Sequence, residues 1–233
     1  MESVDGIGFD LDHTLAIDNR LERVALLRLL EHLLELGGRT IGTLADEINR
    51  IDDLLARQRH GEFSIDEAVS GFVSEHGVPD DPAFAEWFRA RALAMVSEFV
   101  VPLPGVRATI NALRERGIAV AVLTNGWCPL QQRKAGEAGF SGPVLVSSEI
   151  GERKPSAAAF ARLLKELATA PDRTWYVGDS AHADVAGAQQ AGLQAVWFNW
   201  ERHVYPPELT RPQHTIESFG ELLALLPETA RAS

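Results

Sequence analysis

The second half of this chain alternates short apolar runs with helix-like stretches, and this alternation constrains the possible folds more than any other feature. The apolar runs cover residues 118–123, 144–146, 175–177 and 195–198. Helical patterns cover residues 106–116, 129–138, 156–168, 183–191 and 218–226. Such alternation is typical of parallel strands joined by crossover helices. With another apolar run at residues 4–9, it predicts an α/β fold with a parallel sheet of at least five strands.

The pattern of residues 19–98 is different and predicts helices only. Apolar residues recur at helical spacing from Leu21 onward, and further helices are expected at 43–59, from Ser64 to residue 76, and at 82–96. Ser64 and Glu67 are three residues apart, which is the spacing of a capping box. We therefore expect a core domain made of residues 1–16 and 100–233, with a helical domain inserted at residues 17–99.

Composition narrows the classes of function. Apolar residues make up 45% and charged residues 24% of the chain, as in ordinary folded proteins. No apolar stretch is long enough to span a bilayer and no signal-peptide pattern is present, so a cytoplasmic location without membrane association is expected. The net charge of −11 argues against a nucleic-acid polymer as partner. The single Cys128 excludes an internal disulfide framework and a cysteine zinc site. The oligomeric state stays open.

Polar residues follow four successive predicted strands or precede the next helix. They are Asp10 and Asp12, Thr124 and Asn125, Lys154, and Asp179 with Asp184. In an open parallel sheet, functional groups gather outside the carboxyl ends of the strands. We therefore expect these side chains to form one site.

The residue types in this set suit a phosphate and a divalent cation. The carboxylates of Asp10, Asp12 and Asp179 are oxygen donors of the kind that Mg²⁺ prefers. Thr124 can hold phosphate oxygens, and Lys154 stands before a helix N-terminus, where positive charge and backbone dipole both favour an anion. Of two neighbouring carboxylates, one can attack a substrate while the other transfers protons.

In this order, the residues resemble the four motifs of the haloacid dehalogenase-like (HAD) hydrolase superfamily. The matching segments are Asp10-x-Asp12-x-Thr14, Thr124-Asn125, Lys154-Pro155 and Gly178-Asp179-x4-Asp184. The helical insert is similar in placement to the C1 cap of that superfamily. The resemblance implies a Rossmann-like parallel sheet core with an inserted α-helical cap.

The resemblance also implies a role for each residue. Asp10 would be the nucleophile that forms an aspartyl-phosphate, and Asp12 would protonate the leaving alcohol and then activate water. Mg²⁺ would be held by Asp10, the backbone carbonyl of Asp12 and Asp179, with Asp184 supporting it directly or through water. Thr124, with Asn125 beside it, would bind the phosphoryl group, and Lys154 would offset negative charge.

The second aspartate favours a phosphatase within this superfamily. A halide leaves without a proton, and the dehalogenases lack the residue that corresponds to Asp12. A narrower resemblance is to pyrimidine 5′-nucleotidases and acylneuraminate-9-phosphate phosphatases. It is carried by the segments Pro102-Leu103-Pro104-Gly105, Leu123-Thr124-Asn125-Gly126 and Leu130-Gln131-Gln132, together with the helical cap. It implies a small phosphorylated metabolite as the partner, with a nucleoside 5′-monophosphate as the first candidate substrate.

Two other interpretations stay open at this point. In the first, the protein is a phosphotransferase or sugar-phosphate mutase of the same superfamily. In the second, it is a catalytically idle module that binds phosphate or protein. The absence of lysine from residues 1–133 weakens the match to the mutases, whose caps tend to use basic groups. The intact set of Asp10, Asp12, Lys154 and Asp179 argues against an idle module, because buried paired acids are costly to keep.

Overall fold

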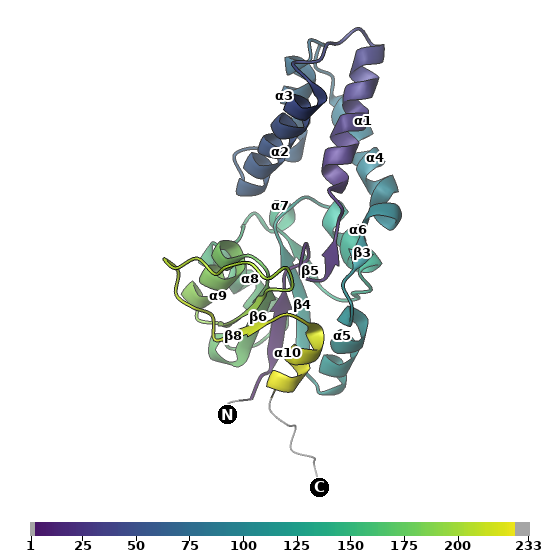
Figure 1. The fold of residues 1–233 in the computed structure, drawn as a ribbon. Helices are drawn as coiled ribbons and strands as arrows, with labels where there is room; N and C mark the ends of the chain where they lie inside the picture. Colours follow the sequence, from purple (N-terminus) through teal and green to yellow (C-terminus); the bar gives the residue numbers. More distant parts are fainter. Residues whose placement is uncertain (1–2, 227–233) are drawn as a thin grey trace. The chain divides into compact units, whose positions relative to one another are not determined.

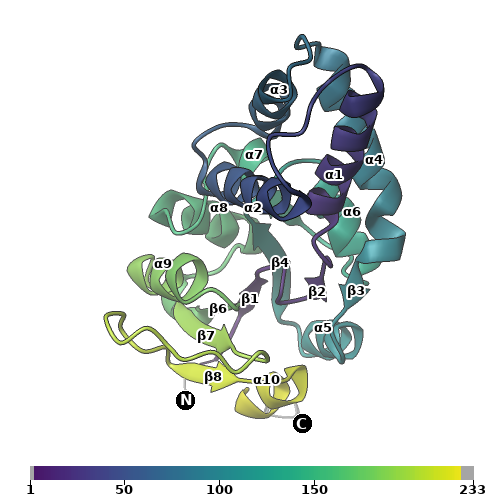
Figure 2. The same cartoon turned by 45° about the horizontal axis from the view of Figure 1, so that its top comes forward.

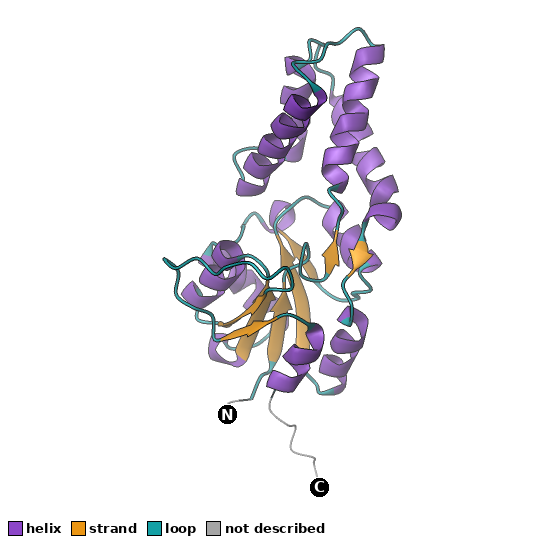
Figure 3. Ribbon diagram, in the orientation of Figure 1, coloured by secondary structure: helices purple, strands orange, loops and turns teal. Residues whose placement is uncertain are grey.

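The computed structural model describes residues 3–226 and divides into two compact units. One unit combines Met1–Ile17 with Val101–Ser233, and the other is Asp18–Val100 (Figure 1). Figure 3 distinguishes them by secondary structure: the first contains the strands, and the second is built from helices. We refer to them as the α/β unit and the helical unit.

The α/β unit is organised around a six-stranded sheet with the order β5-β4-β1-β6-β7-β8, in which every neighbouring pair is parallel. Its strands are β1 (Gly6–Phe9), β4 (Ala119–Thr124), β5 (Val144–Val146), β6 (Thr174–Gly178), β7 (Gln194–Phe198) and β8 (His214–Ile216). The predicted α/β class and parallel sheet are confirmed. Strand β8 was not predicted, because its three residues include a single apolar side chain.

Helices cover both faces of the sheet, which is why its strands read as apolar runs (Figure 2). Phe160 and Leu163 of one layer pack with Tyr176 in a buried cluster. On the other layer, the ring of Phe219 lies 6.3 Å from that of Phe9. The layers and their connections contain α5 (Val106–Glu115), α6 (Leu130–Glu137), α7 (Ser147–Ile150), α8 (Ala157–Leu167), α9 (Gly187–Gln190) and α10 (Phe219–Leu225).

Gly8 allows α8 to approach the central strand closely. A Cβ atom at this position would lie 2.4 Å from Leu163 and 2.8 Å from the ring of Tyr176. Both distances are far below van der Waals contact, so a larger residue would push α8 away from β1. The glycine therefore helps to set the position of the strand that ends at Asp10.

Two local features differ from the sequence prediction. A short antiparallel pair, β2 (Ala16–Ile17) with β3 (Val101–Pro102), joins the points where the chain leaves and re-enters the α/β unit. Two-residue strands are too short to give a periodic signal. The helix expected at residues 183–191 begins instead as a π-helical turn, Ala181–Ala186, and continues as α9.

The helical unit contains α1 (Leu21–Glu35), α2 (Leu44–His60), α3 (Ile65–Glu75) and α4 (Pro82–Phe99). Helix α1 packs on α4, and α3 also packs on α4. Ser64 and Glu67 form the predicted capping box at the start of α3, where each satisfies a backbone N–H of the other. Between residues 3 and 226, no helix combines the length and apolarity needed to cross a membrane.

Candidate active site

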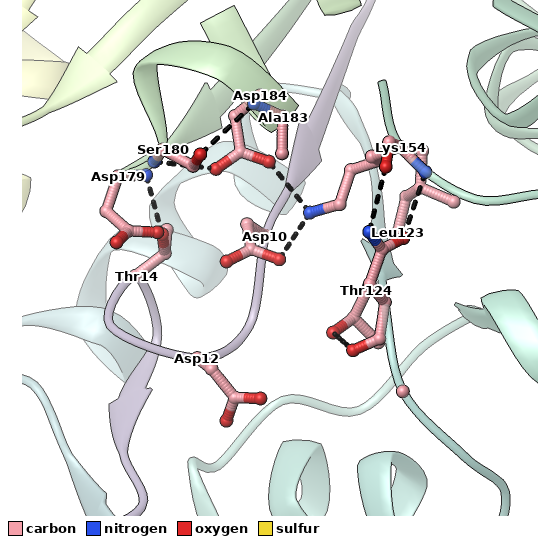
Figure 4. Close-up of polar contacts among 12 residues, drawn as sticks. Asp10, Asp12, Thr14, Leu123, Thr124, Lys154, Asp179, Ser180, Ala183 and Asp184 are labelled. Atoms are coloured by element: carbon pink, nitrogen blue, oxygen red, sulfur yellow. Dashed lines mark hydrogen bonds and ion pairs between the residues drawn. The ribbon is translucent and has the colours of Figure 1, made fainter. Parts of the chain in front are cut away.

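Three adjacent strands of the sheet end in polar residues that the sequence singled out. Asp10 follows β1, Thr124 ends β4 and Asp179 follows β6, and these strands are neighbours in the sheet. Because all three run parallel, their carboxyl ends lie at the same edge. Figure 4 shows their side chains around a common centre with Lys154 and Asp184. The structure thus brings residues from four distant segments together.

Lys154 links the two sides of this site. Its Nζ atom donates hydrogen bonds to Asp10 Oδ1 at 2.5 Å, to Asp184 Oδ1 at 2.8 Å and to Tyr176 Oη at 3.0 Å. The hydroxyl of Tyr176 donates in turn to the carbonyl of Leu123 at 2.7 Å. Three acceptors match the three donors of an ammonium group. The lysine is 4% exposed, and its charge is therefore held in place between two carboxylates.

The side chain of Asn125 holds the loop that carries Lys154. Its Nδ2 donates to the carbonyl of Lys154 at 2.9 Å, and its Oδ1 accepts from the backbone N–H of the same residue, also at 2.9 Å. This paired contact joins the end of β4 to the start of α8. It favours a positioning role for Asn125, whereas the predicted contact of this side chain with substrate stays a prediction.

Asp184 lies in the π-helical turn and is 1% exposed. Besides the bond to Lys154, its Oδ2 accepts from the backbone N–H of Ser180 at 2.9 Å. Gly178 makes room for it, since a Cβ there would lie 2.4 Å from the Asp184 carboxyl carbon. Both oxygens of this buried carboxylate therefore have donors, and the end of β6 is shaped to receive it.

Hydrogen bonds also fix the loops that carry Asp179 and the first aspartates. The backbone N–H of Asp179 donates to Thr14 Oγ1 at 3.2 Å, and its carbonyl accepts from Trp197 Nε1 at 2.7 Å. Trp200 Nε1 donates to the carbonyl of His13 at 2.8 Å. His13 has a φ of 60°, a backbone conformation that side chains other than glycine adopt at a cost. Two indole groups thus hold the two loops that carry the acids.

The carboxylates of this site outnumber the ammonium that neutralises them. Burial raises the pKa of Asp10 to about 7, with Lys154 lowering it and the charge of Asp184 adding to the rise. Burial, reinforced by the charges of Asp10 and Asp184, raises the pKa of Asp179 to about 9. Burial opposes the charge of Lys154, but the two carboxylates beside it hold its pKa well above the usual value. A further positive charge would relieve this repulsion.

The arrangement fits a divalent cation bound by oxygen. Asp10, Asp179 and Asp184 each offer a carboxylate oxygen, and these oxygens all lie within 4.8 Å of one another. An all-carboxylate donor set suits Mg²⁺, whose charge would also offset the burial and repulsion that raise the pKa of Asp10 and of Asp179. Asp184 already accepts from Lys154 and Ser180, so Asp10 and Asp179 are the side chains with more capacity to bind a cation.

Asp12 lies apart from that cluster, as Figure 4 shows, and contacts two residues that the sequence analysis did not place in the site. Lys134 Nζ donates to Asp12 Oδ1 at 2.7 Å, and Gln131 Nε2 donates to Asp12 Oδ2 at 2.9 Å. Gln131 Nε2 also lies 2.9 Å from the hydroxyl of the buried Thr124. The scarcity of lysine in the chain was the available signal for Lys134, and Gln131 belongs to a segment that resembles the nucleotidases. Nothing in the pattern placed either side chain beside Asp12.

The family of this chain follows from a match to the haloacid dehalogenase-like hydrolase model over residues 4–192. That span includes the site and most of the chain. The protein therefore belongs to the haloacid dehalogenase-like hydrolases, in agreement with the resemblance carried by its four motifs.

Curated relatives include two pyrimidine 5′-nucleotidases. YjjG from Escherichia coli is 35% identical over 136 residues, which cover 56% of this chain and 59% of that protein. PynA from Streptococcus pneumoniae is 26% identical over 227 residues, which cover 94% of this chain and 93% of that one. The chain thus matches well under two thirds of YjjG but nearly all of PynA. Other relatives include phosphatases named for different substrates, phosphoserine and phosphoglycolate among them, and the (S)-2-haloacid dehalogenase 2 of a Pseudomonas species, which is 30% identical over 139 residues.

Solved structures support the same fold. The putative HAD-hydrolase YfnB from Bacillus subtilis, described as bound to magnesium, matches 97% of this chain and 99% of its own with a TM-score of 0.72. Its sequence is 24% identical, so this likeness concerns the fold alone.

Proposed function

We propose that the protein is a Mg²⁺-dependent phosphomonoesterase that hydrolyses a small phosphorylated metabolite through a phosphorylated Asp10. The observation that carries this proposal is the buried carboxylate of Asp10, bonded to Lys154 at 2.5 Å and close to Asp179. An anionic nucleophile can approach an anionic ester only where positive charge offsets their repulsion. Lys154 provides part of that charge, and a cation held by Asp10 and Asp179 would provide the rest by polarising phosphoryl oxygens.

In the first half of the proposed reaction, the Asp10 carboxylate attacks phosphorus and the ester P–O bond breaks. The leaving alkoxide takes the proton of the Asp12 carboxyl and departs as an alcohol. Lys154 stays in contact with Asp10 and stabilises the negative charge that gathers on the phosphoryl group. Thr124, at the end of β4, is the proposed phosphoryl-binding hydroxyl.

In the second half, water attacks the phosphorus of the aspartyl-phosphate. Asp12, now ionised, accepts a proton from this water, and the acyl-phosphate P–O bond breaks to release inorganic phosphate and restore the Asp10 carboxylate. The side chain of Asp12 is 29% exposed, which is compatible with a group that meets both alcohol and water. Hydrolysis of a carbon–halogen bond would have no use for this proton donor, which favours phosphate esters.

A nucleoside 5′-monophosphate is the substrate we propose first. Its support is the likeness to the two pyrimidine 5′-nucleotidases, together with the Thr124-Asn125-Gly126 sequence at the end of β4. We further propose that residues 18–100 act as the C1 cap and contain the residues that select the leaving group. Lids of this kind exclude water and choose substrates in capped enzymes.

The test is phosphate release by the purified protein with Mg²⁺. We expect hydrolysis of 4-nitrophenyl phosphate and, at higher kcat/KM, of one member of a panel of nucleotides, sugar phosphates and phosphoglycolate. Asp10→Asn should lower kcat by at least about 10,000-fold, since it removes the nucleophile. Excess EDTA should abolish the activity and added Mg²⁺ restore it. Undiminished activity in Asp10→Asn or in EDTA would refute the mechanism.

The same assay separates the two other interpretations. A phosphotransferase or mutase would give little free phosphate with water as sole acceptor and much more phosphoryl transfer when a second alcohol is added. An idle binding module would hydrolyse neither the aryl phosphate nor any member of the panel. Stoichiometric release of phosphate and alcohol in water supports the phosphomonoesterase.

A further inference from the structure

The chain contains three lysines, and two of them are buried against the two carboxylates of the Asp-x-Asp pair. Lys154 contacts Asp10, and Lys134 contacts Asp12 at 2.7 Å. Lys134 is 1% exposed, whereas Lys165, the third, is exposed on α8. The first contact belongs to the proposed phosphoryl chemistry. The second contact, between Lys134 and Asp12, is not used in that chemistry.

Lys134 and Gln131 together engage both oxygens of Asp12. They stand three residues apart on α6, so that their side chains leave the same face of the helix. Lys134 Nζ donates to Oδ1, and Gln131 Nε2 donates to Oδ2 at 2.9 Å. Since one donor lies on each oxygen, rotation of the carboxyl group about its bond to Cβ would break both contacts.

Gln131 is itself held from the neighbouring strand end. Its Nε2 atom lies 2.9 Å from Thr124 Oγ1 and 3.1 Å from the carbonyl of Asn125, in addition to Asp12 Oδ2. The two amide hydrogens are thus shared among acceptors from two strand ends. Gln131 thereby ties the position of Asp12, after β1, to that of Thr124, which ends β4.

Stability does not explain why a lysine is buried at position 134. A buried ammonium loses its hydration, and an apolar side chain of similar size would serve packing equally well or better. The same helix buries Leu130 and Ala135, so apolar residues do suit its inner face. The charge of Lys134 faces the one carboxylate of the Asp-x-Asp pair that is not bonded to Lys154.

We propose that Lys134, with Gln131, is a positioning residue that holds the Asp12 carboxyl for proton transfer to the leaving alcohol. This inference rests on the function proposed above for Asp12. Lys134 acts through that carboxyl and touches no reacting atom. Its loss lets Asp12 rotate away, so the step that needs the proton slows while phosphoryl transfer to a good leaving group proceeds.

The experiment compares two esters of nearly equal shape, phenyl phosphate and 4-nitrophenyl phosphate. The 4-nitrophenolate anion leaves readily without a proton, whereas phenolate depends far more on one. kcat/KM reports the steps through transfer to Asp10, before water enters. We expect Lys134→Met to lower kcat/KM for phenyl phosphate by about tenfold or more and for 4-nitrophenyl phosphate by less than about threefold.

Three further variants make the result decisive. Lys165→Met, a matched loss of an exposed lysine, should leave both values unchanged. Lys134→Arg should recover part of the loss with phenyl phosphate, because it restores a cationic donor. In an Asp12→Asn background, Lys134→Met should cause no further loss, since the group that it positions is already gone.

Equal losses with the two esters, or a full additional loss in the Asp12→Asn background, would overturn this inference and leave the phosphomonoesterase intact. Unchanged rates with both esters in Lys134→Met would do the same. A wild-type protein that hydrolyses neither ester, nor any member of the metabolite panel, would overturn the proposed function and this inference with it. Circular dichroism and the melting temperature of each variant identify a loss caused by misfolding.

Discussion

The helical unit and the α/β unit treat buried charge in opposite ways. In the helical unit, Glu47 and His76 are 1% and 0% exposed and lie 3.1 Å apart. The backbone N–H of Ile41 donates to Glu47 Oε1 at 2.6 Å, and the other ring nitrogen of His76 lies 2.6 Å from the carbonyl of Phe72. Burial acts against the charge of Glu47, but hydrogen bonds from Ile41 and His76 outweigh it and hold its pKa below the usual value.

In the α/β unit, the carboxylates of Asp10, Asp179 and Asp184 surround a single ammonium, that of Lys154. Burial raises the pKa of Asp10 and that of Asp179, and the charges of the neighbouring carboxylates add to the rise. The helical unit thus surrounds its buried Glu47 carboxylate with hydrogen-bond partners, as a structural contact requires, and we refer to Glu47 and His76 as the balanced pair. The α/β unit keeps negative charge in excess, which is what binding a cation requires.

The largest effect is expected from removing Lys154, whose positive charge offsets part of the buried negative charge of the α/β unit. Lys154→Met leaves Asp10 and Asp184 buried without their shared donor. We expect kcat/KM for 4-nitrophenyl phosphate to fall by at least about 1,000-fold, because the charge beside the nucleophile is lost. The free energy of unfolding should fall by about 3 kcal/mol, as for other broken buried pairs. Steady-state kinetics and urea unfolding measure the two effects.

The matched control for Lys154→Met is Lys165→Met on the surface of α8. It should leave both the rate and the unfolding curve of the wild type unchanged. If Lys154→Met were as stable as this control, Lys154 would not be the main counter-charge of the buried carboxylates.

The second prediction removes one member of the balanced pair. Glu47→Ala leaves the Ile41 N–H and His76 without their acceptor, and we expect the free energy of unfolding to fall by about 3 kcal/mol. Glu47→Leu combined with His76→Leu should recover most of that loss, because no uncompensated charge remains buried. Glu75→Ala, at an exposed glutamate of α3, should cost less than about 1 kcal/mol. A double variant that is less stable than Glu47→Ala would contradict a purely structural pair.

The strand ends were predictable because their physical signal is local. A run of apolar residues such as the one before Asp10 predicts a buried strand, and parallel strands place their carboxyl ends at one edge. The order of Asp10, Thr124, Lys154 and Asp179 along the chain was therefore enough to predict one site, without any knowledge of distances.

The contacts that hold these residues in place were not predictable in the same way. Lys134 reaches Asp12 across 122 positions of sequence, and the contact depends on how α6 is rotated against the sheet. Asn125 was predicted beside the phosphoryl group, yet its amide pairs with the backbone of Lys154. Such pairings depend on side-chain direction and loop conformation, which leave no periodic pattern in the sequence.

The third prediction removes a carboxylate from the cluster with excess charge. Asp179→Asn should lower kcat/KM by at least about 100-fold at fixed Mg²⁺, since a proposed metal ligand is lost. The metal-free variant should nevertheless be more stable than the wild type by about 1 kcal/mol, because the cost of burying this carboxylate and its repulsion with Asp10 and Asp184 are both removed. Mg²⁺ should raise the melting temperature of the wild type and leave that of the variant nearly unchanged. Equal stabilisation of both by Mg²⁺ would remove Asp179 from the cation site.

The smallest expected effect concerns the pH dependence of the balanced pair. The pKa of Glu47 is lower in the folded protein than its ordinary value of 4.5, so its ionised form favours folding. This contribution is complete above the unfolded pKa and is lost as the pH falls below about 4.5 toward the lower folded value. In Glu47→Gln the group cannot titrate, and the decline in unfolding free energy between pH 6 and pH 3.5 should be shallower than in the wild type.

Urea unfolding at several pH values measures this difference. The contributions of the other carboxylates to the pH dependence cancel in the comparison, because both proteins contain them. A steeper decline in Glu47→Gln than in the wild type would mean that burial wins over the hydrogen bonds at Glu47. The carboxylate of Glu47 would then resemble those of Asp10 and Asp179, whose pKa values burial raises. In that case the helical unit too would bury negative charge at a cost, and the two units would differ in the number of buried charges and not in their balance.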